Sequence, residues 1–114
     1  MTFLLDGFDF KEEAMIHMAI AALENAGYDL SVVKQLIRAD MPPGYRAMTL
    51  ADGAALATPA FASQAILNHV LEEELIHLFQ KQQGLAGEFG PTTAQSLENE
   101  VDENRKFPLP KPNA

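Results

Sequence analysis

The sequence contains no cysteine and no tryptophan. Without cysteine the chain has no disulfide bond and no thiolate ligand, so any metal ion must be bound by His, Asp or Glu side chains. The sequence also lacks a run of about 20 apolar residues, which a membrane-spanning helix requires. We therefore expect no membrane partner.

Basic residues are scarce. The chain has 8 Lys and Arg residues against 16 Asp and Glu residues, which gives a net charge of −8 and a pI of about 4.7. A surface of this sign repels a phosphate backbone, and the few basic residues form no stripe, so we expect no nucleic-acid partner. A basic peptide or protein is the partner that complements this charge.

The chain has 114 residues, 47% of them hydrophobic, which is enough for one domain with one core. We predict a single domain over residues 1–107, followed by a disordered proline-rich tail over residues 108–114. Residues 1–9 carry two acids and no basic residue, which is not typical of a secretory signal. The expected location is the cytoplasm, unless the chain is one piece of a larger secreted protein.

Local signals predict a first helix near the N-terminus. Asp9 is a good N-cap for a helix that begins at Phe10, and Gly27 is the expected residue just beyond its end. Apolar residues recur with helical spacing and predict one broad apolar stripe, formed by Ala14, Met18, Ala22 and Ala26 with Met15, Ile16, Ala19 and Leu23 beside them.

The middle of the chain predicts a small sheet. Residues 31–40 fit either a strand or a short helix, and the two prolines that follow end this element. Residues 45–50 and 54–58 read as two strands joined by a tight turn. Ser63 is then expected to cap a second long helix that ends near Gln83, and Thr92 or Thr93 a third that ends near Lys106.

The second long helix carries the residues that could bind a metal ion or take part in catalysis. At about 100° per residue, its leucines form a core face, and His69, Glu73 and His77 form a row along one edge. Glu74 falls inside the apolar arc, where a carboxylate is costly unless it is paired, protonated or facing a cavity. Glu73 and His77 lie one turn apart, a spacing that lets two side chains bind one metal ion. A buried acid beside such a pair can take a proton from a polarised water molecule.

Structural explanations compete with this one. A His–Glu pair four residues apart is often a surface ion pair, and three consecutive glutamates are usually a solvated face. Three consecutive residues on a helix cannot share a face, however, and Glu74 points at the leucines. Three side chains in a straight row rarely converge on one ion, so His69 is predicted to orient Glu73 rather than to bind metal.

This helix resembles the active-site helix of the zincin metallopeptidases, which carries the motif His-Glu-x-x-His. Here Glu73-Glu74-Leu75-Ile76-His77 occupies the motif, with Glu73 in place of the first histidine. The preceding hairpin, which ends in Ala-Thr-Pro-Ala-Phe, is also similar. Downstream, residues 98–107 resemble the glutamate helix of the gluzincin branch, in which a glutamate supplies the third metal ligand. Glu100 is the first candidate for that role and Glu98 the second.

The resemblance implies an α+β fold with a minimal zincin-like core: an N-terminal helix, a small antiparallel sheet, an active-site helix and a C-terminal ligand helix. It implies that Glu74 is the general base and that Glu73, His77 and Glu100 or Glu98 hold the metal. A glutamate in place of the first histidine makes the site harder and more anionic, so Zn²⁺, Mn²⁺ and Fe²⁺ all suit it. By analogy of fold, small domains of this kind occur as the toxic tips of larger secreted bacterial proteins.

Two functions are therefore considered. The first is a metal-dependent hydrolase, most simply a peptidase that acts on a peptide or protein substrate. The second is a catalytically inactive acidic interaction domain, either a degenerate zincin or an immunity-type protein that occupies a basic partner. Glu74 discriminates between them, because it belongs to an active site if it is buried and faces a cleft with His77, and to the scaffold if it pairs with Arg46, Lys34 or another basic residue.

Overall fold

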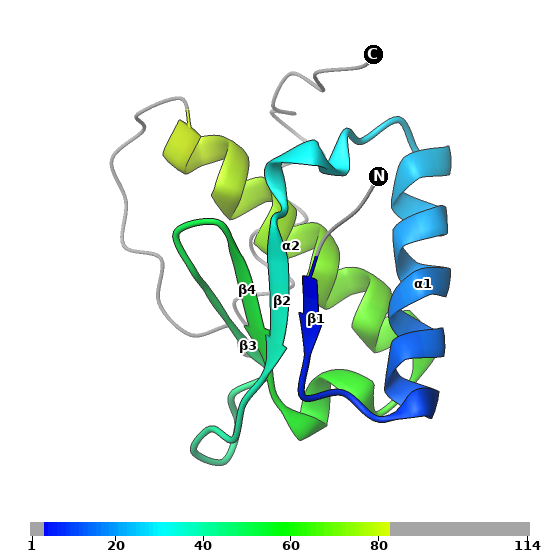
Figure 1. The fold of residues 1–114 in the computed structure, drawn as a ribbon, viewed down its shortest axis with the longest axis vertical. Helices are drawn as coiled ribbons and strands as arrows, with labels where there is room; N and C mark the ends of the chain where they lie inside the picture. Colours follow the sequence, from blue (N-terminus) through cyan, green and yellow to red (C-terminus); the bar gives the residue numbers. More distant parts are fainter. Residues whose placement is uncertain (1–3, 83–114) are drawn as a thin grey trace.

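The computed structural model describes residues 4–82, with side chains as far as Leu78. In this range the chain forms a four-stranded sheet and two long helices, joined by loops and short 3-10 helices (Figure 1). The predicted third helix, the proline-rich tail and the candidate ligands Glu98 and Glu100 lie outside the described residues.

The sheet has the strand order β1-β2-β4-β3. Strand β2 (Gln35–Arg38) pairs in parallel with both β1 (Leu4–Asp6) and β4 (Gly53–Leu56), whereas β3 (Ala47–Thr49) is antiparallel to β4. The predicted α+β class is thus confirmed, but the prediction of an antiparallel sheet is wrong because the sheet is mixed. The sequence predicted only the antiparallel hairpin, which is formed by β3 and β4. Parallel neighbours need a long crossover, and α1 supplies it between β1 and β2.

Helix α1 (Phe10–Asn25) begins and ends as its capping signals predict. The Asp9 carboxylate accepts a hydrogen bond from the Glu12 backbone N–H at 2.7 Å, and the Glu12 carboxylate accepts one from the Asp9 N–H at 3.1 Å. This reciprocal pair is a capping box. Gly27, just past the helix, has φ of +94°, which glycine adopts without strain.

The buried face of α1 overlaps the predicted stripe but is shifted from its centre, since Ile16, Ala19 and Leu23 were predicted beside that centre. The buried residues are Ile16, Ala19, Ile20 and Leu23, whereas Ala14, Met18, Ala22 and Ala26 are exposed. Alanine and methionine lie on both sides of this helix, so their spacing alone did not select a face. The larger branched side chains bury more apolar surface, and they determine which face turns inward.

Residues 31–40 contain parts of both predicted alternatives, a 3-10 helix η1 (Leu30–Val32) followed by β2. Asp29 caps η1, since its carboxylate accepts a hydrogen bond from the Ser31 N–H at 2.9 Å. Hydrogen bonds from the Ser31 backbone and side chain lower the pKa of the Asp29 carboxyl below its usual value. The cap thus favours the ionised form of Asp29.

The predicted hairpin and second helix are confirmed. The turn between β3 and β4 is closed by a hydrogen bond from the Leu50 N–H to the Gly53 carbonyl at 2.8 Å. A 3-10 helix η2 (Thr58–Phe61) then leads into α2 (Gln64–Gln82), where the Ser63 hydroxyl accepts the Ile66 N–H at 3.1 Å as an N-cap.

Helix α2 passes behind the sheet and packs on β3, β4 and α1 (Figure 1). One continuous core fills the space between these elements, with Ile16 from α1, Leu36 and Leu56 from the sheet and Leu67 and Leu75 from α2 among its members. Neither described helix is long and apolar enough to cross a lipid bilayer. Because α2 lies across the sheet, the motif residues of its second half are next to the end of β3.

Candidate functional site

Three polar residues of α2 are buried within a single helical turn. The exposed fraction is 0% for Glu73, 2% for Glu74 and 6% for His77. The predicted burial of Glu74 is confirmed. Glu73 and His77, which the sequence placed along an edge of the helix, are also buried. Burial of charged groups is costly, so these side chains need partners that compensate for the loss of water.

A threonine from the sheet joins two of them. The Thr49 hydroxyl, at the end of β3, donates a hydrogen bond to Glu74 Oε2 at 2.6 Å, and its oxygen lies 3.0 Å from Nδ1 of His77. All three side chains are at least nine-tenths buried. Glu74 is therefore connected to His77 through one hydroxyl group.

Thr49 was not predicted as a site residue from the sequence. A signal was nevertheless present in β3, because Ala47 and Thr49 alternate with the exposed Met48 and therefore share the inward face. A hydroxyl on the core face of a strand needs a hydrogen-bond partner. A threonine at such a position therefore predicts a polar partner on the helix that packs against the strand.

The other nitrogen of the His77 ring faces Glu73. Its Nε2 lies 3.7 Å from Glu73 Oε1. These atoms form an ion pair when the imidazole is protonated, and they are also the two donor types that zinc accepts from such residues. Two ligands at bond lengths of about 2.0–2.1 Å in tetrahedral geometry stand roughly 3.3 Å apart. The observed separation is close to that value, so the pair fits two positions around one divalent cation.

A small cavity adjoins the site. Its volume is about 20 Å³, and it lies between α1, β2, β4 and α2, where Glu74 is the one charged side chain among the described residues that line it. That volume suffices for about one water molecule, but the apolar lining offers few hydrogen bonds to hold one. The cavity therefore gives the Glu74 carboxylate an apolar environment, in which electrostatic interactions are stronger than in water.

Among the described residues, no further predicted ligand completes a metal site at this cluster. In the stretch from Leu4 to Gln82, no group of three His, Asp or Glu side chains is arranged to hold a metal ion together. Glu73 and His77 supply two donors, and the predicted third ligand, Glu100 or Glu98, lies outside the described residues. His69 is exposed, two turns before His77 on α2. The histidine that contacts the Glu73 carboxylate is His77 and not His69, so no contact among the described residues supports the predicted role of His69 in orienting Glu73.

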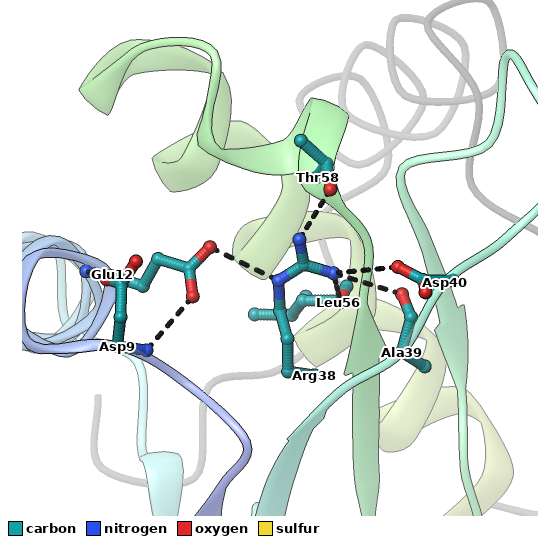
Figure 2. A network of polar contacts seen from close by, with 7 residues as sticks. All are labelled: Asp9, Glu12, Arg38, Ala39, Asp40, Leu56 and Thr58. Atoms are coloured by element: carbon teal, nitrogen blue, oxygen red, sulfur yellow. Dashed lines mark hydrogen bonds and ion pairs between the residues drawn. The ribbon is translucent and has the colours of Figure 1, made fainter.

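A second polar cluster lies at the other end of the sheet, around Arg38 (Figure 2). Here a polar cleft of about 390 Å³ is bordered by Asp9, Glu12, Arg38 and Asp40. The Arg38 guanidinium donates to the Glu12 carboxylate, to the Thr58 hydroxyl and to the carbonyls of Ala39 and Leu56. Most of its donors are thus used within the fold, and Arg38 acts as a connection between α1, β2 and η2.

Comparison of the chain with protein-family models, with curated proteins and with solved structures finds no match. The site is therefore interpreted from its own geometry.

Proposed function

We propose that this domain is a metal-dependent hydrolase, and specifically a zincin-like peptidase. Glu73 and His77 hold the metal ion, together with Glu100 or Glu98, and Glu74 is the general base. The observation that carries the proposal is the burial of Glu73, Glu74 and His77 within one turn of α2, with Glu74 and His77 joined through Thr49. A purely structural core has no need of two adjacent buried carboxylates, since apolar residues of similar size are usually at least as stabilising.

Each of these side chains has a distinct task. A divalent cation held by Glu73 and His77 would supply Lewis-acid chemistry to a water molecule and to the carbonyl group of a substrate. Glu74 accepts a proton from the attacking water and delivers it to the amine that leaves. The apolar surroundings of Glu74 favour this transfer, because a carboxylate there is less stabilised by solvent than one on the surface. Thr49 holds Oε2 of Glu74 in place for it.

The position of β3 supports a peptide as the substrate. In the described part of the sheet β3 is an edge strand, and it carries Thr49, which contacts both Glu74 and His77. An extended peptide can add to such an edge through backbone hydrogen bonds. A peptide paired with β3 would run past the site. The net charge of −8 favours a basic sequence in that peptide.

The same net charge favours a second function, an acidic interaction domain that occupies a basic protein partner. In that case Glu73, Glu74 and His77 form a buried polar network without catalytic use. The two functions differ in one measurable property, which is the binding of a metal ion by His77.

The decisive measurement is the metal content of the full chain, purified without a histidine tag and analysed by elemental analysis. We expect close to one equivalent of zinc, manganese or iron. The metal should be lost in His77→Gln and retained in His69→Gln, which removes an exposed histidine from the same helix. Circular dichroism establishes that both variants remain folded.

Metal that depends on His77 justifies a screen of peptidase activity, with Glu74→Gln as the control that binds metal without hydrolysis. Absence of metal from the wild-type protein, even after incubation with zinc, would overturn the hydrolase proposal and leave the acidic interaction domain. Metal retained in the folded His77→Gln variant would place the binding site elsewhere in the chain.

A further inference from the structure

Thr49 lies between Glu74, the proposed general base, and His77, a proposed metal ligand. Its hydroxyl oxygen is 2.6 Å from Glu74 Oε2 and 3.0 Å from His77 Nδ1. A hydroxyl group has one proton to donate, so it cannot donate to both neighbours. The direction of these two hydrogen bonds therefore determines which nitrogen of His77 carries a proton.

The two distances favour one direction. The contact to Glu74 is the shorter of the two, at 2.6 Å, and the Thr49 hydroxyl is its donor. Thr49 donates its single hydroxyl proton in this contact, so that proton points to Glu74. Toward His77 the hydroxyl oxygen must then be the acceptor, and Nδ1 of the ring must be the donor.

We propose that Thr49 is a positioning residue that holds His77 as the Nδ1–H tautomer and fixes the direction of the Glu74 carboxylate. In a neutral imidazole this tautomer leaves the lone pair on Nε2, the nitrogen that faces Glu73. With its lone pair on Nε2, His77 can bind a cation together with the Glu73 carboxylate oxygen that it faces. The metal-related part of this inference rests on the proposed function, whereas the tautomer is a property of the metal-free protein.

The backbone around Thr49 is well fixed for this task. Thr49 is the register partner of Ala54 in β4, and the next residue, Leu50, donates its N–H to Gly53 at 2.8 Å. Threonine is also branched at Cβ, which limits the rotation of its side chain. The hydroxyl is thus presented to α2 from a strand that is hydrogen-bonded to β4, where it contacts two side chains one turn apart.

The test uses two substitutions that separate the hydroxyl from the shape of the side chain. Thr49→Val keeps the shape and removes the hydroxyl, and Thr49→Ser keeps the hydroxyl. Tautomers are read from long-range proton–nitrogen spectra of the ¹⁵N-labelled full chain without metal, at about pH 8, where a free imidazole is neutral. His17→Gln and His69→Gln, at exposed positions, assign the His77 signals by elimination.

We expect His77 to carry its proton on Nδ1 in the wild type and in Thr49→Ser. In Thr49→Val it should change to the Nε2–H tautomer, which can donate to Glu73. An Nε2–H or doubly protonated ring in the wild type would overturn the proposal, as would an unchanged Nδ1–H signal in Thr49→Val. Amide spectra of the variants verify that the fold is retained.

Zinc titration of the same proteins separates this proposal from the proposed function. A metal-bound histidine usually makes a hydrogen bond through its other ring nitrogen, and loss of that bond typically weakens metal binding by about 10–100-fold. We expect this weakening in Thr49→Val and near wild-type affinity in Thr49→Ser. No zinc binding in the wild type, with the tautomer as expected, would refute the hydrolase and leave the role of Thr49 on His77 intact. Equal zinc affinity in Thr49→Val and wild type would refute the role of Thr49 toward the metal while the site itself stands.

Discussion

Glu73 and Glu74 are adjacent in sequence and are both almost completely buried. Consecutive helical residues point in directions about 100° apart, so the two carboxylates are buried on different sides of α2. Each must lose most of its hydration, and together they place two acids in the interior of a domain with a net charge of −8. Groups placed at such a cost are concentrated in functional sites. The burial of both carboxylates therefore favours a functional site on α2.

A second residue, Gly53, determines how closely β2 and β4 approach at the start of β4. It is the register partner of Gln35 in β2. A Cβ atom built on Gly53 would lie 1.7 Å from the Gln35 carbonyl oxygen, which is far inside van der Waals contact. The conflict is with backbone atoms, so no change of rotamer can relieve it, and the two strands would have to separate.

We predict that Gly53→Ala lowers the free energy of unfolding by about 3 kcal/mol, the upper end of the usual cost of overpacking, because the conflict is with backbone atoms. Gly44→Ala is the matched control, because a Cβ there meets no atom within 4 Å and the residue has φ of +92°. That backbone conformation alone should cost about 1–2 kcal/mol. Urea unfolding of both variants gives the comparison, and an equal loss in the two would contradict the close approach at Gly53.

At the scale of elements, Arg38 connects the start of α1 to the ends of β2 and β4. Its Nε lies 3.2 Å from Glu12 Oε2, while the other carboxylate oxygen of Glu12 accepts the Asp9 N–H of the capping box (Figure 2). The guanidinium also lies over the Phe61 ring, with 5.8 Å from Cζ to the ring centroid. One carboxylate thus serves both the helix cap and the contact between helix and sheet.

We predict that Arg38→Met destabilises the protein by about 1–3 kcal/mol, between the values typical of exposed and of buried ion pairs, because the Glu12 and Arg38 side chains are 18% and 17% exposed. Glu12→Gln should cost less, since glutamine preserves the capping box. The double variant measures the coupling between the two residues, expected at about 0.5–3 kcal/mol. Additive effects of the two single changes would show that the ion pair contributes nothing to stability.

The elements differ in how far the sequence predicts them. The ends of α1 follow from Asp9, Glu12 and Gly27, because capping depends on residues within one turn. The pairing of β1 with β2 joins residues some 30 positions apart. No local pattern in residues 4–6 marks that partner, so β1 was missed.

The candidate site shows the same division. The phase of α2 predicts that Glu74 faces the core, and this is confirmed. The complete burial of Glu73 was not predicted, since periodicity identifies the inward side of a helix but not how much of its circumference is covered. Thr49 was missed because its role appears only once β3 is placed against α2.

At the scale of the whole molecule, a metal site and the stability of the fold are linked. A ligand that binds only the folded state raises the free energy of unfolding, by about 2.7 kcal/mol at a free concentration 100 times its dissociation constant. Here the linkage should be efficient, because Glu73 and His77 are held by α2, and α2 packs on α1 and on two strands of the sheet. Unfolding of any of these elements separates or exposes the ligands.

We therefore predict that saturating zinc raises the Tm of the metal-free full chain by roughly 10 °C, as that stabilisation implies for a domain of about 100 residues. EDTA should reverse the shift. His77→Gln should show none, whereas His69→Gln should behave like the wild type, because the exposed His69 lies outside the cluster. Scanning calorimetry measures all four conditions. A wild-type Tm that does not respond to zinc would exclude a structurally coupled site, and an equal shift in His77→Gln would assign the stabilisation to other ligands.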